Sequence, residues 1–428
     1  MTILVVRACL PVFSISNMRN SKPVHTPKLQ FQVADNCLCI GGIPVTKLAQ
    51  QVGSTPFYAY DKNLISQRVQ HIRANFPTSI LLHYSVKANP MPALLQHMQG
   101  LVDGFDIASG GELKLVLDTT MRPEQISFAG PGKTDSELEK SLTAGVIIHL
   151  ESENEVLRVA RIGEALGITP QVMVRVNPDF ELKSSGMKMG GGASQFGIDA
   201  ELVPSVLKQI NSLGVKFLGL HIYAGSQNLS PLAIIETHNK TFEMAISLAQ
   251  ESPQKIQILN IGGGFGIPYF AGETPLDIKP IGENLHQWLP RLNSKLPDVK
   301  VVVELGRYLV GEAGIYVSKI IDRKQSRGHT FVICDGGMNH HLAASGNLGQ
   351  TIRKNYHVVV GNKFSGTQRE IVTVTGPLCT PLDLIADKME MACSEPGDLI
   401  VIFQSGAYGL SASPAGFLSH ALPKEVLL

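Results

Sequence analysis

The sequence predicts an α/β protein that consists of a (β/α)8 barrel and a second, all-β domain. Eight apolar segments alternate with helical patterns, and nearly every segment ends in a polar or glycine-rich residue. This alternation predicts parallel strands joined by right-handed crossovers. An open, doubly wound sheet would give the same alternation, but eight units with polar ends favour closure into a barrel. The predicted barrel strands are residues 80–86, 104–108, 126–130, 146–150, 171–176, 217–222, 256–261 and 299–304.

The pattern changes after residue 310. Segments such as GIYVSKII and DLIVIFQ follow one another, separated by glycine, proline, asparagine and lysine, which predicts an all-β domain. Two short apolar segments between residues 29 and 60 flank turn signals and predict a strand that leads into the barrel. We therefore expect four regions, which are an N-terminal extension (1–27), an N-terminal strand that packs with the β domain (28–55), the barrel (56–310) and the C-terminal β domain (311–428).

Composition disfavours several functional classes. The net charge is +1 and aromatic residues make up 6%, which argues against a nucleic-acid or membrane partner. No segment approaches the roughly 18 apolar residues of a membrane span. The N-terminus is a poor signal peptide because Arg7 and Pro11 interrupt its apolar run. The six cysteines lack a disulfide-framework spacing, so we expect a soluble protein of a reducing compartment, the cytoplasm.

Lys87 ends the first predicted barrel strand, in HYSVKANP. Catalytic residues of such barrels lie at the C-terminal ends of the strands. A lysine amine there can form an imine with an aldehyde cofactor, and we expect partial desolvation to lower its pKa and make it a better nucleophile. The plainer alternative is a surface lysine at the end of a strand, which is the more common fate of a lysine.

The glycine run GGGFG, which begins at Gly262, follows the seventh predicted strand. Glycines such as Gly263 and Gly264 let backbone N–H groups approach a phosphate closely. The run has neither the G-x-G-x-x-G spacing nor a Walker lysine, which disfavours a dinucleotide or a triphosphate. A monophosphate at the mouth of a barrel fits, although glycine turns are common and the run alone is a weak signal.

Polar residues also end the sixth and eighth predicted strands. Glu304 can keep a pyridine nitrogen protonated, and Arg307 can pair with a phosphate, although both could instead form a structural ion pair. His221 can stack on a cofactor while Ser226 binds phosphate. The plainer interpretation of His221 is a core histidine with a satisfied hydrogen bond.

Four more residues have candidate roles. Asp106 and Arg175 end predicted strands, and we expect them to form a buried pair. Cys379, in GPLCTPLD, can donate a proton to a carbanion if it reaches a partner's site, although an inert small apolar residue is the alternative. Asp383 is placed to bind a substrate amine.

Metal binding is disfavoured. His340 and His341 are adjacent and cannot easily point the same way on a strand, and neither they nor His83 have a carboxylate at ligand spacing. Cys37 and Cys39 are too close together for the usual zinc knuckle and have no second pair nearby. We expect no metal site.

Taken together, these segments resemble the fold-type III pyridoxal-phosphate decarboxylases, which include diaminopimelate, ornithine and arginine decarboxylases on an alanine-racemase-like barrel with a β domain. The resemblance covers about residues 30–425. It rests on the ordered motifs SVKAN, FDIASGGEL, HIYAGSQ, GGGFGIPY, ELGRYLV, DGGMNHH, GPLCTPLD and SGAYG.

The resemblance implies pyridoxal 5'-phosphate as the cofactor and a homodimer with shared active sites. Lys87 would form the Schiff base through which CO2 leaves the α-carbon, and Cys379 would supply a proton across the dimer interface. His221 would assist catalysis by stacking on the ring, which Glu304 would hold through its nitrogen. The expected cofactor-binding residues are Lys87, Asp106, Arg175, His221, Ser226, Gly263, Gly264, Glu304, Arg307 and Tyr408, and the expected substrate-binding residues are Asp383 and Tyr308.

Two departures bear on the substrate. Diaminopimelate decarboxylases usually carry an acid directly after this cysteine, where this chain has Thr380, and a proline where this chain has Leu305. The segments DGGMNHH, KMGGGASQFGID, GPLCTPLD and GAYGLSASP instead resemble a subgroup that includes the butirosin-pathway decarboxylase of carrier-bound glutamyl groups. We therefore expect a decarboxylase of an amino acid or a carrier-tethered amino-acyl group, with diaminopimelate decarboxylase as the alternative.

Three other classes remain to be weighed. A racemase on the same barrel needs a second catalytic base, usually a tyrosine from the β domain, whereas the GPLC motif favours decarboxylation. A non-catalytic regulatory homologue would have lost cofactor contacts, and this sequence keeps them. A small pyridoxal-phosphate carrier protein would lack the β domain and Cys379.

Overall fold

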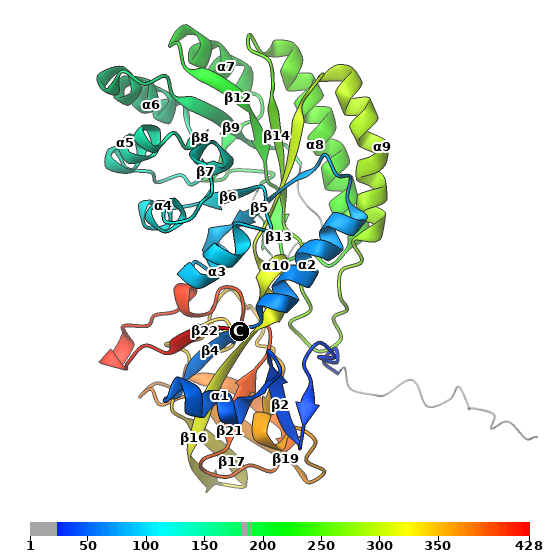
Figure 1. The fold of residues 1–428 in the computed structure, drawn as a ribbon, viewed down its shortest axis with the longest axis vertical. Helices are drawn as coiled ribbons and strands as arrows, with labels where there is room; N and C mark the ends of the chain where they lie inside the picture. The colour runs from blue at the N-terminus through cyan, green and yellow to red at the C-terminus, as the bar shows by residue number, and fades with distance from the viewer. Residues whose placement is uncertain (1–23, 181–186, 189) are drawn as a thin grey trace, which may run out of the picture.

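The structure is a computed structural model that describes residues 24–180, 187–188 and 190–428. Two parts are stacked along the longest axis of the molecule, with a barrel at one end and a β-rich part at the other (Figure 1). Most of the expected N-terminal extension (1–27) lies outside the described residues, and so does part of the segment KMGGGASQFGID.

The first part is a closed barrel of eight parallel strands. Each strand pairs with its neighbour, and the ring closes where β15 pairs with β5 and where β9 pairs with both β8 and β12. All eight predicted strands are present, and closure rules out the open sheet. The strands are β5 (Leu81–Ser85), β6 (Gly104–Ile107), β7 (Ile126–Phe128), β8 (Ile147–Leu150), β9 (Gln171–Asn177), β12 (Lys216–Ile222), β14 (Ile258–Gly263) and β15 (Lys300–Leu305).

Helices surround the barrel strands (Figure 1). Their apolar faces pack on the outside of the strands and form one continuous core with them. The helices are α2 (Lys62–Asn75), α3 (Pro92–Met98), α4 (Gly110–Leu117), α5 (Asp135–Ala144), α6 (Glu153–Leu166), α7 (Val203–Ser212), α8 (Pro231–Glu251), α9 (Lys279–Lys295) and α10 (Arg307–Val310). Short elements at the barrel rim are η2 (Val86–Ala88), β10 (Met187–Lys188), β11 (Ile198–Asp199), β13 (Gly225–Ser226) and η4 (Gly311–Ala313).

Local chemistry defines several helix ends. Ser109, Thr134 and Ser152 each accept a hydrogen bond from a backbone N–H of the first turn, so α4, α5 and α6 start directly after them. Gly145 and Gly167 adopt the left-handed conformation that ends α5 and α6. After each of these helix ends the chain turns back, and the next parallel strand starts at the N-terminal end of the barrel. The C-terminal ends of all eight strands therefore lie at one rim.

The second part is a sheet centred on the long strand β16 (Gly314–Ser326). β16 pairs antiparallel with β17 (His329–Cys334), β21 (Leu399–Ile402) and β4 (Phe57–Tyr60). This arrangement confirms the β-rich second part. The remaining strands are β18 (Val358–Val360), β19 (Arg369–Thr375), β20 (Leu384–Ala392) and β22 (Lys424–Leu427).

The N-terminal segment packs on this second sheet with more elements than the one strand expected. It forms β1 (Val33–Ala34), β2 (Cys37–Ile40), β3 (Ile43–Pro44) and α1 (Val45–Val52). Of these, β2, β3 and α1 share a core with β4, β16 and β21. The barrel was expected to start at residue 56, but β4 lies between β16 and β22, and all four of its residues are buried. The first barrel element is therefore α2.

Candidate active site

A ring of polar side chains fills the inside of the barrel near its C-terminal rim. Each of the eight strands contributes one side chain, and all eight are buried. Buried polar groups cannot hydrogen-bond to bulk water, so they need partners inside the protein. Placing these groups here therefore lowers the stability of the fold. Its members are Ser85, Asp106, Ser127, His149, Arg175, His221, Asn260 and Glu304.

Above the ring is a cavity of about 290 Å³, and a smaller chamber adjoins it. Ser85, Lys87, Tyr223 and Glu304 line both spaces, so the two form one continuous site. The larger space is lined in addition by Asp106, Arg175, Phe196 and His221. The smaller one is lined in addition by Ser226, Gly264, Arg307 and Tyr408. Most of the residues that the sequence predicted are therefore brought together here.

Lys87 lies in η2, directly after β5, and extends into this site. Its side chain is accessible from the cavity, although protein surrounds it on nearly every side. Burial lowers the pKa of Lys87, but Tyr408, Tyr223 and Glu304 raise the pKa by more, so the net shift is upward. The expectation that desolvation lowers this pKa is therefore wrong for the protein alone, because the expectation left out the neighbouring groups, Tyr408 first and then Tyr223 and Glu304.

Glu304 is the negative centre of the site. Its Oε2 accepts a hydrogen bond from Nδ2 of Asn260 at 3.1 Å, and its Oε1 lies 3.3 Å from Nε2 of His221. Burial raises the pKa of Glu304, but the positive charges of His221 and Lys87 lower the pKa further, well below its usual range. Glu304 is therefore a carboxylate at neutral pH.

Arg175 and Asp106 do not form the expected pair. Arg175 donates to Oε1 of Glu151 at 2.8 Å, and Asp106 instead accepts from Ser127 and lies 3.3 Å from His83. The reason is the order of strands around the ring: β6 carries Asp106 and β9 carries Arg175, with β7 and β8 between them. Glu151 directly follows β8, which is the neighbour of β9.

The glycine run of the smaller chamber is held tightly against its neighbours. Gly264 has a φ of +78°, and a Cβ there would overlap the carbonyl oxygen of Gly225. A Cβ on Gly263 would likewise overlap the carbonyl oxygen of Glu304. Only glycine fits these two positions, and the bare backbone leaves room for a ligand beside Ser226.

Arg307 is the cation of the smaller chamber. Its Nη1 donates to the hydroxyl of Tyr269 at 2.9 Å, and its guanidinium lies 4.5 Å from the ring centre of Tyr408. The two aromatic rings fix the orientation of the planar guanidinium, and a group held in this way can bind an oxyanion through two hydrogen bonds.

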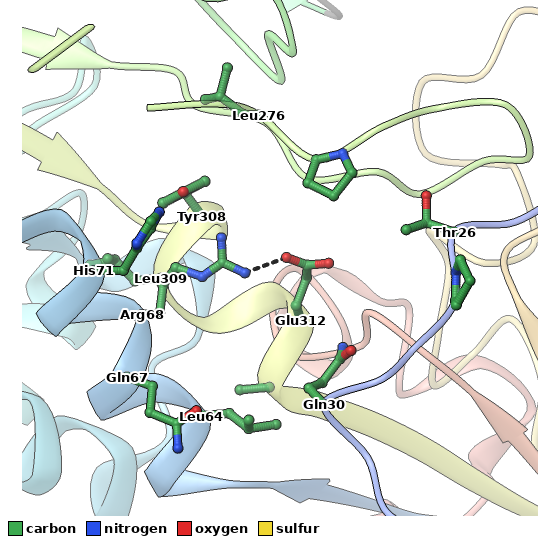
Figure 2. A pocket seen from close by; sticks show the side chains of 13 residues that line it. Thr26, Gln30, Leu64, Gln67, Arg68, His71, Leu276, Tyr308, Leu309 and Glu312 are labelled. Atoms are coloured by element: carbon green, nitrogen blue, oxygen red, sulfur yellow. Dashed lines mark hydrogen bonds and ion pairs between the residues drawn. The ribbon is translucent and has the colours of Figure 1, made fainter. Parts of the chain in front are cut away.

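Tyr308 does not reach this site, which corrects its expected role in substrate binding. Successive side chains of a helix point about 100° apart, so Tyr308 points away from the chamber that Arg307 lines. Tyr308 lines a separate pocket of about 380 Å³ at the junction of the two parts, beside Arg68 and Glu312 (Figure 2). Its ring packs under the Arg68 guanidinium at 4.5 Å.

Cys379 and Asp383 also lie outside the cavity of their own chain. Cys379 is exposed on the loop between β19 and β20. Asp383 is buried, and its two oxygens accept hydrogen bonds from the backbone N–H groups of Met338 (2.7 Å) and Leu378 (2.8 Å). The carboxylate of Asp383 therefore holds this loop in place, and its expected role as the ligand of a substrate amine stays a prediction.

Sequence reasoning missed several residues of the site. Tyr223 lines both spaces, and burial raises its pKa to about 12. Its position two residues after His221 was the available signal. His149 and Asn260 were detectable as polar residues inside apolar strands, and Glu151 as an acid directly after a strand.

Comparison with known proteins identifies the class of this barrel enzyme. Residues 62–311 match the family described as "Pyridoxal-dependent decarboxylase, pyridoxal binding domain". The chain belongs to this family, so it is a decarboxylase that uses pyridoxal phosphate, as the motifs predicted.

Individual relatives cover nearly the whole chain. The L-glutamyl-[BtrI acyl-carrier protein] decarboxylase of Niallia circulans is 38% identical over 87% of this chain and 88% of its own length. The diaminopimelate decarboxylase of Aquifex aeolicus is 31% identical over 91% of this chain and 90% of its own. The crystal structure of M. jannaschii diaminopimelate decarboxylase with L-lysine superposes with a TM-score of 0.85, at 26% identity, over 93% of this chain and 92% of that one.

The residues around the site fit pyridoxal 5'-phosphate. Arg307 and the bare backbone at Gly264 suit a phosphate, Glu304 suits a protonated pyridine nitrogen, and the Lys87 amine suits an aldehyde. Asp106 Oδ2 and His221 Nε2 are buried at the cavity without an aligned hydrogen-bond partner among the described residues. Such unsatisfied atoms are typical of a functional site.

The described residues contain neither a membrane-spanning helix nor a metal-binding cluster. No helix in them is long and apolar enough to cross a membrane. No three histidine, cysteine or acidic side chains among these residues come together as ligands of a metal ion.

Proposed function

We propose that this enzyme removes the α-carboxylate of a glutamyl group, or of a similar amino-acyl group, that is attached to a carrier protein. The observation that carries the proposal is the loop that bears Cys379. Within residues 376–383, all of which the structure describes, Asp383 is the only acid, and backbone N–H groups already occupy its carboxylate. This loop thus offers no free negative charge to the distal ammonium of diaminopimelate. A tethered glutamyl group has no such ammonium, so a neutral loop suits it.

The positions of the site residues support the following roles. Lys87 holds the cofactor covalently and releases the product amine, while Glu304 stays ionised and keeps the pyridine nitrogen protonated. Arg307, with Ser226 and the backbone of Gly264, holds the phosphate. When bound, the cofactor accepts the electron pair that the departing CO2 leaves behind.

Cys379 protonates the α-carbon after CO2 has left. It is exposed and does not line the cavity of its own chain, so we assign it to the active site of a second copy in a homodimer. We further propose that residues 28–60 belong with residues 311–428 in one β domain, because β4 pairs with β16 and β22. The cytoplasm, the compartment expected from the cysteines, suits thiol chemistry at Cys379.

The test is CO2 release by the cofactor-loaded protein with four substrates, namely carrier-tethered L-glutamate, free L-glutamate, meso-diaminopimelate and L-ornithine. We expect turnover of the tethered glutamate and little of the others. Robust turnover of diaminopimelate would refute the proposal and favour lysine biosynthesis.

Thr380 offers a sharper version of this test. Thr380→Glu places a free acid next to Cys379, and we expect this variant to gain activity on diaminopimelate. Thr380→Gln has nearly the same size without the charge and serves as the matched control. Equal activity of the two variants on diaminopimelate would show that the charge of this loop does not select the substrate.

A further inference from the structure

Two buried histidines of the polar ring face one another with their Nδ1 atoms. Nδ1 of His149 lies 2.9 Å from Nδ1 of His221, and the ring centres are 4.7 Å apart at an angle of 54°. Both residues are 1% exposed. His149 comes from β8 and His221 from β12, so the contact spans the strand β9 that separates them. None of the roles assigned above uses His149.

The place of His149 is set by a second buried group. Lys133 donates a hydrogen bond from Nζ to the carbonyl oxygen of His149 at 3.0 Å, and Lys133 itself pairs with Glu155 at 3.0 Å. Both charged side chains are almost fully buried. The backbone at His149 is therefore anchored from outside the site, and the imidazole contacts His221 from a fixed position.

The contact between the two Nδ1 atoms restricts where the protons are. One nitrogen must carry a hydrogen and the other must offer a lone pair. Burial, with the nearby charge of His221 as the next cause, lowers the pKa of His149 well below its ordinary value. His149 is therefore neutral and has a single N–H.

The opposite nitrogen of His221 faces Glu304. Its Nε2 lies 3.3 Å from Oε1 of Glu304, which is a carboxylate. A lone pair on Nε2 would face this negative charge, whereas an N–H there is attracted to it. His221 therefore lies between a carboxylate on its Nε2 side and the imidazole of His149 on its Nδ1 side.

We propose that His149 is a positioning residue that holds His221 through a hydrogen bond between their two Nδ1 atoms. This bond fixes the ring plane of His221, so that Nε2 stays beside Glu304 and the ring lines the cavity. His149 thus acts on the cofactor site through His221 and makes no contact with the substrate. A second imidazole inside the barrel supports the first, as outer-shell groups orient histidines in other functional sites.

Nitrogen NMR of the protein labelled with ¹⁵N-histidine tests this directly, without cofactor or substrate. We expect a scalar coupling between the two Nδ1 nuclei, which a hydrogen bond between them transmits. The absence of this coupling would overturn the proposal.

Variants extend the test to the cofactor. His149→Phe keeps a ring without a hydrogen-bonding group, whereas the side-chain amide of His149→Asn can replace the lost hydrogen bond. We expect His149→Phe to bind pyridoxal phosphate roughly tenfold more weakly, the effect of about one buried hydrogen bond, and His149→Asn to restore most of the affinity. His97→Phe on α3 is the control and leaves the affinity unchanged. If His149→Phe does not fold, the NMR spectrum of the wild-type protein and the Asn variant decide. A His149→Asn protein that binds the cofactor no more tightly than a His149→Leu protein would overturn the proposal.

Discussion

Replacing Gly264 by alanine changes the phosphate end of the site by a single methyl group. The residue has a φ of +78°, which alanine adopts only with strain. The new Cβ would overlap the carbonyl oxygen of Gly225 and lie 3.5 Å from Cα of Ser226. The turn that carries Ser226 must therefore move away from the cavity wall.

The magnitude follows from these two effects. The left-handed backbone costs alanine about 1–2 kcal/mol. Forcing a methyl group into a packed region costs about 1–3 kcal/mol more. We therefore expect Gly264→Ala to lower the free energy of unfolding by about 2–5 kcal/mol. Because the displaced turn carries Ser226, the affinity for pyridoxal phosphate should fall at least about tenfold, the equivalent of about 1.4 kcal/mol.

Gly214 provides a matched control. It has a φ of +68°, close to that of Gly264, but no atom lies within 4 Å of its would-be Cβ. Gly214→Ala should therefore lose only the backbone contribution, about 1–2 kcal/mol, and bind the cofactor normally. Denaturant unfolding of the cofactor-free proteins gives the stabilities, and an absorbance titration gives the affinities. If both variants lose the same stability and keep the same affinity, the tight packing around Gly264 has no functional consequence.

Three further outcomes are expected. Lys87→Ala should abolish the visible absorbance of covalently bound cofactor and turnover together; a variant that keeps both would remove Lys87 from the mechanism. Cys379→Ala should slow product formation at least about tenfold, within the range of a lost general acid, while cofactor affinity stays within error; unchanged turnover would exclude Cys379. Burial lowers the pKa of His238 to about 4 and that of His341 to about 3, from an ordinary value of 6.5. Unfolding therefore takes up protons below pH 6.5, and the free energy of unfolding should fall by up to about 1.4 kcal/mol per histidine for each pH unit between 6.5 and these values. Denaturant titrations at pH 7 and pH 5 measure this loss, and equal stability at both would contradict it.

The sequence allowed the barrel to be predicted strand by strand, because an apolar run with a polar end is a local pattern. Lys87 and Glu304 were found in the same way, at the ends of their strands. Side-chain contacts that depend on the order of the strands in the closed barrel could not be predicted. Arg175 pairs with Glu151 only because β8 is the neighbour of β9. Similarly, nothing local in the sequence shows that His149 reaches across β9 to His221.

The direction of α10 and the packing of the loop between β19 and β20 set a second limit on what the sequence could predict. Tyr308 follows Arg307 in the sequence, and its side chain nevertheless enters another pocket because α10 begins between β15 and the β-rich part. Asp383 has the charge of a substrate ligand, but its surroundings make it an anchor for its own loop. The residue type was visible in each sequence motif, whereas the direction of the side chain was a property of the folded chain.

The position of β4 has a consequence for how the protein is made. Phe57–Tyr60 leave the ribosome before any barrel strand, yet one partner, β16, is synthesised after the whole barrel. The other partner is β22, so the final pairing waits until Lys424–Leu427 have been translated. Contacts between segments so distant in the chain form slowly. During that interval an apolar strand has open edges, and a nascent chain that pauses is then exposed to aggregation through this one short segment.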